Sequence, residues 1–164
     1  MDVNARKSKD EVYSYLKRLT IGILSTVSDR GKPYASVIYF VADHNLNFFF
    51  ITKSDTKKAQ NLEKNNNAAI TILDPENPKT IQATGTARKV QDPDIYSYML
   101  KRIAEENSKK GGFYWPPPIS KLKSMGDLVM YRLEPDWLRF GDFTESAFAS
   151  TTSTKTNIFY QVIP

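Results

Sequence analysis

Three short strand patterns, joined by tight turns, constrain the fold of this chain more than any other feature. Residues 21–26 alternate between two faces at the period of a strand. The segment 28–33 has turn chemistry with a glycine, 34–41 is β-branched and aromatic, and a tight turn at 43–45 leads into a third strand at 46–52. Because short turns join strands that run in opposite directions, the sequence predicts an antiparallel meander here.

The rest of the chain adds further strands and a few helices. Ser8 and Glu11 fit a capping box that starts a helix at 9–19. The other predicted elements are a helix at 57–64, strands at 68–73, 80–90 and 127–140, and a helix that starts at Asp92–Pro93. Many short antiparallel strands with few helices indicate a mainly β fold, a small β-barrel with peripheral helices, and not a parallel α/β sheet.

Three segments leave alternatives open. Gly85 interrupts the strand at 80–90, either as a bulge or as a close backbone approach at a subunit seam. The aromatic, proline-rich segment 113–118 is either a loop packed against the barrel or a lid over a ligand. Residues 141–164 form either an extra strand or a C-terminal extension that lies on a partner subunit. With 164 residues, the whole chain 1–164 is expected to be a single domain.

The scarcity of cysteine and histidine restricts the chemistry. The chain has no cysteine and one histidine, His44. This excludes disulfides, a thiolate nucleophile and a thiolate or multi-histidine metal site, so we expect no metal. His44 falls in the turn at 43–45 and is predicted to be an exposed turn residue rather than a catalyst. Redox chemistry would therefore depend on a bound cofactor.

Charge and hydropathy indicate whether the chain binds a nucleic acid or a membrane. The net charge is +5, and the basic residues are mixed with acidic ones. This pattern indicates a solvated surface and no nucleic-acid partner. No apolar run approaches the ~20 residues of a membrane-spanning helix, and residues 1–7 lack the apolar region of a signal peptide. We expect a cytoplasmic protein with no membrane partner.

Two lysines mark the start of the predicted helix at 57–64. Lys57 and Lys58 follow a strand end and a short polar loop that contains Thr52 and Thr56. Basic side chains are unfavourable at a helix N-terminus, so two of them together suggest an anion that offsets the cost. Backbone N–H groups, hydroxyls and ammonium groups together suit a phosphate. The residues alone leave a second interpretation open, two solvated surface lysines.

Three segments in succession resemble a known family. The segments 21–41, 46–72 and 81–90 are similar, in order and spacing, to those of the pyridoxamine 5′-phosphate oxidase-like, FMN-binding split-barrel family. The resemblance implies a six-stranded antiparallel split β-barrel, a homodimer, and FMN bound between the two subunits. It also implies a small flavin oxidoreductase that acts on a small-molecule substrate.

The resemblance also implies the residues that hold the cofactor. Those matched to the phosphate and the adjoining side of the flavin are Ile51, Thr52, Lys53, Thr56, Lys57 and Lys58. Those matched to the strand whose backbone faces the edge of the isoalloxazine are Ser36, Val37, Ile38 and Tyr39. A polar residue near the ring or ribityl chain matches Thr80 or Gln82, and Trp137 matches an aromatic that reaches across the dimer.

One departure separates this chain from the oxidases that name the family. They carry an Arg-x-His substrate signature shortly after the C-terminal tryptophan, and Trp137 is followed by no histidine. Pyridoxamine phosphate oxidation itself is therefore not expected. The alternatives are an F420-dependent reductase of the same fold, a non-catalytic flavin- or haem-binding stress-related protein, and an interaction module without a cofactor.

Overall fold

The described part of the computed structural model comprises residues 8–74, 76–108, 127–144 and 159–163. Its strands are β1 (Ile21–Val27), β2 (Pro33–Ala42), β3 (Phe48–Lys53), β4 (Asn67–Leu73), β5 (Lys79–Lys89), β6 (Leu128–Asp142) and β7 (Phe159–Ile163). Its helices are α1 (Lys9–Leu16), α2 (Lys57–Lys64) and α3 (Pro93–Ser108). The segment 113–118, predicted as a loop or lid, lies outside the described residues.

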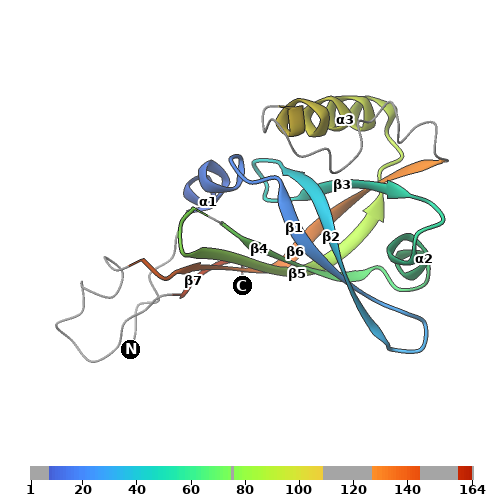
Figure 1. Ribbon diagram of the computed structural model, residues 1–164, viewed down its shortest axis with the longest axis horizontal. Helices are drawn as coiled ribbons and strands as arrows, with labels where there is room; N and C mark the ends of the chain where they lie inside the picture. Colours follow the sequence, from blue (N-terminus) through green and yellow to red (C-terminus); the bar gives the residue numbers. More distant parts are fainter. Residues whose placement is uncertain (1–7, 75, 109–126, 145–158, 164) are drawn as a thin grey trace.

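The first six strands form a closed antiparallel barrel. Their order is β3-β2-β1-β4-β5-β6, and β3 pairs in turn with β6 to close the sheet. The meander predicted for 21–52 is confirmed as β1, β2 and β3, and so is the mainly β, six-stranded barrel. The chain enters β7 after the barrel is complete, and β7 pairs with the outer end of β6. Figure 1 shows the β1–β2 hairpin extending beyond the rest of the barrel.

Alternation along the strands sends one row of side chains into the barrel. Leu24, Phe50, Ile81 and Leu133 are fully buried there. Helix α1 adds Leu16 to the same core. Because the sheet curves around this apolar interior, the barrel is stabilised by its own core and needs no second sheet packed against it.

Helix α3 covers part of the outside of the barrel (Figure 1). Met99 and Ile103 on this helix pack against Val41, Phe49 and Met130, which face away from the interior. The strands β2, β3 and β6 are therefore buried on both faces under α3, while β1, β4 and β5 keep an uncovered outer face in the described chain.

Local signals in the sequence fix the helix starts. Ser8 caps α1 as a full capping box with Glu11, and Thr56 caps α2. The Asp92 carboxylate accepts from the N–H groups of Asp94 and Ile95 at 2.9 and 3.1 Å, which confirms it as the cap of α3. Side chains that satisfy orphan N–H groups stabilise a helix end.

Three details refine the predictions. Strand β3 starts at Phe48 instead of Leu46 because Leu46 adopts φ 66° in the preceding turn. His44 is exposed in that turn, as predicted, and its ring lies 3.9 Å from the ring of Tyr13. The register of β5 and β6 shifts at Gly85, so the bulge is present. A Cβ on Gly85 would lie 2.0 Å from the Glu134 carbonyl oxygen, which explains why this position is glycine.

Candidate functional site

The barrel is split between β2 and β3. Only residues 40–42 of β2 pair with residues 48–50 of β3, and the rest of β3 pairs with β6. Residues 33–39 of β2 consequently have a strand partner on one side alone, β1, within the described part of the chain. An open strand edge of this length, about 20 Å at the usual rise per residue, exposes backbone donors and acceptors.

The backbone groups at this open edge can be assigned. The Phe40 N–H donates to the Thr20 carbonyl at 2.9 Å, on the β1 side. Since hydrogen-bonding direction alternates along a strand, the N–H and C=O of Ala35, Val37 and Tyr39 point the other way, to the open edge. Of the four predicted strand residues, Ser36 and Ile38 therefore direct their backbone groups to β1, and Val37 and Tyr39 direct theirs to the split.

Helix α2 begins at the open end of the split. Two buried contacts hold it in place: Ala59 lies in the barrel core, and the Asn61 side chain donates to Thr26 Oγ1 of β1 at 3.0 Å. The Thr56 hydroxyl caps the helix and lies 3.0 Å from the hydroxyl of Thr52 at the end of β3. Lys58 Nζ donates to that same Thr52 hydroxyl at 3.3 Å. The structure thus brings together Thr52, Thr56 and Lys58, which the sequence matched to a phosphate site.

The charge at this helix start is positive and only partly balanced. The first turn of α2 has no acidic residue. Lys58 is half-buried, and burial lowers the pKa of its ammonium group. Lys53 pairs with Asp55 at 3.4 Å, but Lys58 has no carboxylate partner among the described residues. A half-buried cation that lacks a carboxylate partner in the described chain, at the positive end of a helix, is costly unless an anion binds there.

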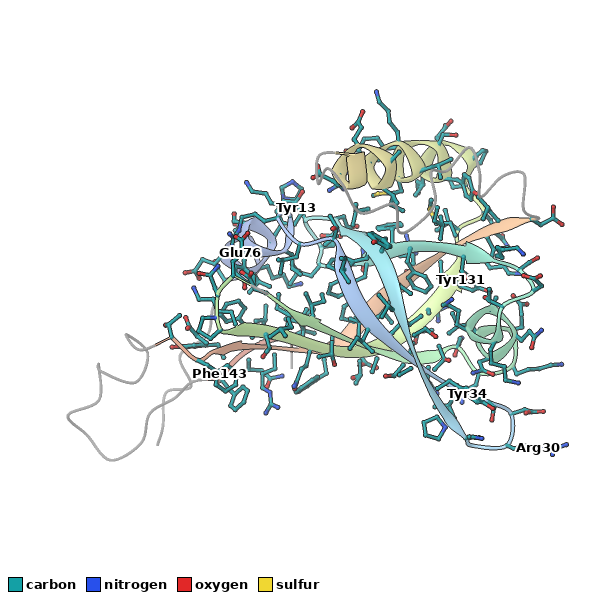
Figure 2. All side chains as sticks on the ribbon, in the orientation of Figure 1. Tyr13, Arg30, Tyr34, Glu76, Tyr131 and Phe143 are labelled. Atoms are coloured by element: carbon teal, nitrogen blue, oxygen red, sulfur yellow. The ribbon has the colours of Figure 1, made fainter. Side chains whose placement is uncertain are left out.

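Lys57 points to the β1–β2 hairpin instead. Its Nζ lies 5.3 Å from the centre of the Tyr34 ring, and Lys32 Nζ lies 5.6 Å from the same ring. Figure 2 shows Tyr34 on the projecting hairpin, with Arg30 at the tip. These contacts place the start of α2 beside the start of β2, so the split is bounded by cations at its open end.

Other predicted residues lie on different faces. The side chain of Ile51 packs against the cluster under α3, while Thr52 faces α2. Thr80, Gln82 and Trp137 lie on the outer face of β5 and β6. Lys53, just before α2, pairs with Leu128 of β6, and Trp137 lies nine residues further along that strand, about 30 Å at the usual rise per residue. Within one chain, the structure does not bring these three residues to the lysines of α2.

A row of paired residues crosses the outer face from the split to β7. It runs Val37, Ile23, Thr71, Gln82, Arg139 and Gln161. At the β1 and β2 end, Ile23 is 47% exposed and Val37 57% exposed, and the nearby Ile21 and Leu73 are also exposed. Apolar residues gathered on one uncovered sheet face mark an interaction surface.

Sequence reasoning did not find Arg139 at the other end of this row. Its Nη2 donates to Gln82 Oε1 at 3.0 Å, and its guanidinium carbon lies 5.4 Å from the Trp137 ring and 4.2 Å from the Phe159 ring. The spacing of two residues from Trp137 on a strand puts both side chains on one face and was a signal available in the sequence. The contact of Phe159 with Arg139 could not be read from the sequence, because it depends on the pairing of β7 with β6.

Two findings concern metals and membranes. Within the described ranges, no three carboxylate or imidazole side chains gather in a way that could hold a metal ion. None of the helices in those ranges is long and apolar enough to cross a bilayer.

Comparison with known proteins gives one consistent family. The family model described as pyridoxamine 5′-phosphate oxidase matches residues 8–141. The pyridoxine/pyridoxamine 5′-phosphate oxidase of Shewanella pealeana is 27% identical over 114 residues, which cover 68% of this chain and 53% of that protein. The chain thus spans about half the length of that relative.

Solved structures share the fold. A conserved hypothetical protein of Mycobacterium tuberculosis, Rv2991, superposes with a TM-score of 0.69 at 16% identity, covering 94% of this chain and 95% of that one. An F420 reductase superposes with a TM-score of 0.57 at 26% identity, covering 76% and 93%. Strand β7 lies beyond the residues that the family model matches.

Proposed function

The chain belongs to the pyridoxamine 5′-phosphate oxidase family, and we propose that it binds FMN in the split of the barrel as a flavin-dependent oxidoreductase for a small molecule. One observation carries the proposal. Lys58 is a half-buried cation at the capped start of α2, has no carboxylate partner in the described chain, and adjoins the open backbone edge of β2. An anionic group attached to a flat polar ring fits both features.

In this proposal the phosphate of FMN binds at the start of α2. Lys58 and Lys57 supply charge, the hydroxyls of Thr52 and Thr56 supply hydrogen bonds, and the first N–H groups of the helix point at the same place. The phosphate would restore to Lys58 the counter-charge that it lacks. Lys53 contributes less because Asp55 already pairs with it.

The flavin ring would lie along the open edge of β2. The backbone groups of Val37 and Tyr39 face the split and are suited to the polar edge of the ring. Bound FMN would supply hydride or electron transfer, which requires no thiol or histidine from the protein. The chain's own part is to orient the ring, hold the phosphate and exclude water from one face.

We propose that a second copy of the chain completes the site. The exposed residues Ile21, Ile23, Val37 and Leu73 offer an apolar face next to the split, as a homodimer requires. Apposed outer faces would bring Trp137 and either Thr80 or Gln82 of one subunit toward the split of the other. For Trp137 this agrees with the resemblance, which matches it to an aromatic that reaches across the dimer.

Visible absorption tests the proposal. Purified protein, or FMN-free protein titrated with FMN, should show a bound-flavin spectrum and quenched flavin fluorescence. The double variant Lys57→Glu/Lys58→Glu should lose both signals, whereas Lys101→Glu, at an exposed position of α3 that pairs with Glu105, should keep them. A colourless protein that ignores added FMN would contradict the proposal, and a haem spectrum would favour a haem-binding protein. Flavin-dependent NAD(P)H oxidation would then separate an enzyme from a binding protein.

F420 is the second candidate cofactor. Lys32 lies beside the Tyr34 ring, which it shares with Lys57 of the proposed phosphate site, so a longer anionic tail would meet one further cation there. The similarity to an F420 reductase supports the same choice. Competition between F420 and FMN for the FMN-free protein decides between them, because the cofactor of the site should bind more tightly and displace the other.

A further inference from the structure

Arg139 is a cation that no carboxylate pairs with in the part of the chain that the structure describes. Arg18, Arg88 and Arg132 each pair with a carboxylate. Arg139, in contrast, has no acidic partner among the described residues, and its buried Nε has no hydrogen-bond partner there. Partly buried guanidinium groups are normally paired, so this one is available to a group that the described residues do not supply.

The neighbours of Arg139 fix its orientation. Gln82 accepts from Nη2 at 3.0 Å, and the rings of Trp137 and Phe159 lie on either side of the guanidinium along the sheet. Gly141 makes the room for this arrangement, because a Cβ there would lie 2.7 Å from Thr80 Oγ1 and 3.2 Å from the Phe159 ring. A planar donor fork held beside aromatic rings is the arrangement that recognises planar oxyanions.

A carboxylate from a second copy of the chain could also pair with Arg139, in place of a small anion. The outward positions of β1, β2, β4 and β5 carry no aspartate or glutamate. If two chains pack by this face, those four strands therefore offer Arg139 no acidic partner. The carboxylates of β6 are already engaged: Asp136 accepts from Thr84, Asp142 pairs with Lys79, and Glu134 pairs with Arg88 and Arg132. A small anion is therefore favoured over these carboxylates as the partner of Arg139.

We infer that Arg139, anchored by Gln82 and flanked by Trp137 and Phe159, recognises the carboxylate of a planar organic substrate. The inference rests on the proposed function, since it names the substrate class of the same dimeric site. It also gives β7 a role, because the ring of Phe159 flanks Arg139. Phe159 lies outside residues 8–141, the part of the chain that matches the family.

Titration calorimetry of FMN-free protein with benzoate tests the inference without the cofactor. Benzoate should bind the wild type, and Arg139→Gln should raise its Kd at least about tenfold, as expected for losing a charge-assisted hydrogen bond. Arg139→Lys keeps the charge but not the fork and should fall between the two. Arg88→Gln removes the same charge from an exposed position on β5 and should leave the Kd for benzoate unchanged. Lys58→Met should also leave it unchanged, which separates this site from the phosphate site.

The outcomes are distinct from those for FMN. Equal benzoate affinity in wild type and Arg139→Gln, or no binding to the wild type, would overturn the inference while FMN binding could still succeed. Benzoate binding that depends on Arg139 in a protein that ignores FMN would keep the anion site and reject the proposed function. If Arg139→Gln turns a dimer into monomers in sedimentation and benzoate has no effect, the partner of Arg139 is a protein group and the inference is wrong. Cooperative thermal unfolding of each variant shows that it is folded.

Discussion

Replacing Lys58 by methionine should have opposite effects on stability and on cofactor binding. Methionine keeps most of the length of the side chain and removes only the ammonium group. In the free protein that group is half-buried at the positive end of α2, with the Thr52 hydroxyl 3.3 Å away as its described partner. Burial disfavours the charged form of this ammonium group and so lowers the pKa of Lys58.

The two magnitudes follow from these contacts. Removing a cation from a helix N-terminus relieves an unfavourable interaction of about 0.3–1 kcal/mol, and the hydrogen bond that is lost is long. The free energy of unfolding of the free protein should stay the same or rise by up to about 1 kcal/mol. A charge-assisted hydrogen bond to phosphate contributes about 1.5–3 kcal/mol, so the Kd for FMN should rise about ten- to hundredfold.

Urea unfolding of the FMN-free protein and FMN fluorescence titration measure the two quantities. Lys64→Met is the matched control, because Lys64 lies exposed in the last turn of the same helix. Its charge is favourable there, so the control should lose about 0.3–1 kcal/mol of stability and bind FMN normally. The reasoning is refuted if Lys58→Met loses more than about 1 kcal/mol of stability and still binds FMN with the wild-type Kd, because Lys58 would then be structural.

Three further predictions concern stability and assembly. Burial would raise the pKa of Asp74, but hydrogen bonds from Tyr15, from the backbone and from a neighbouring amide outweigh it and lower the pKa to about 2. A lowered carboxylate pKa stabilises the fold above pH 4, so about 2 kcal/mol should be lost as the pH falls from about 4 to about 2, and acid titration of Asp74→Asn should lack this loss. Gly85→Ala should cost at least about 2 kcal/mol in urea unfolding, since the new Cβ meets backbone at 2.0 Å; a neutral change would mean that the bulge can relax. Ile23→Lys/Val37→Lys should yield monomers by sedimentation with an unchanged circular dichroism spectrum, and a persistent dimer would place the interface elsewhere.

Much of the fold could be predicted from the sequence because the signals are local. Alternation in 21–26 and the turn at 28–33 specified the first hairpin. Asp55 and Thr56 were both possible caps before Lys57, and the structure shows that Thr56 is the one used. The lysines after Thr56 stood out for the same reason, since a helix dipole acts on the residues next to it. The start of β3 was less accurate, because the left-handed turn at Leu46 is not encoded by a glycine.

Only the tertiary structure decided which of these residues share a site. The sequence by itself determined the meander and the helix caps, and it singled out a pair of lysines that suggest an anion without excluding a solvated surface. Closure of β3 onto β6 opened the split beside β2, and pairing of β7 with β6 set Phe159 against Arg139. Strand pairing between distant segments depends on the summed packing of the whole barrel, which no local pattern contains. The open edge of β2 and the guanidinium of Arg139, which has no carboxylate partner among the described residues, are therefore visible only in the folded chain.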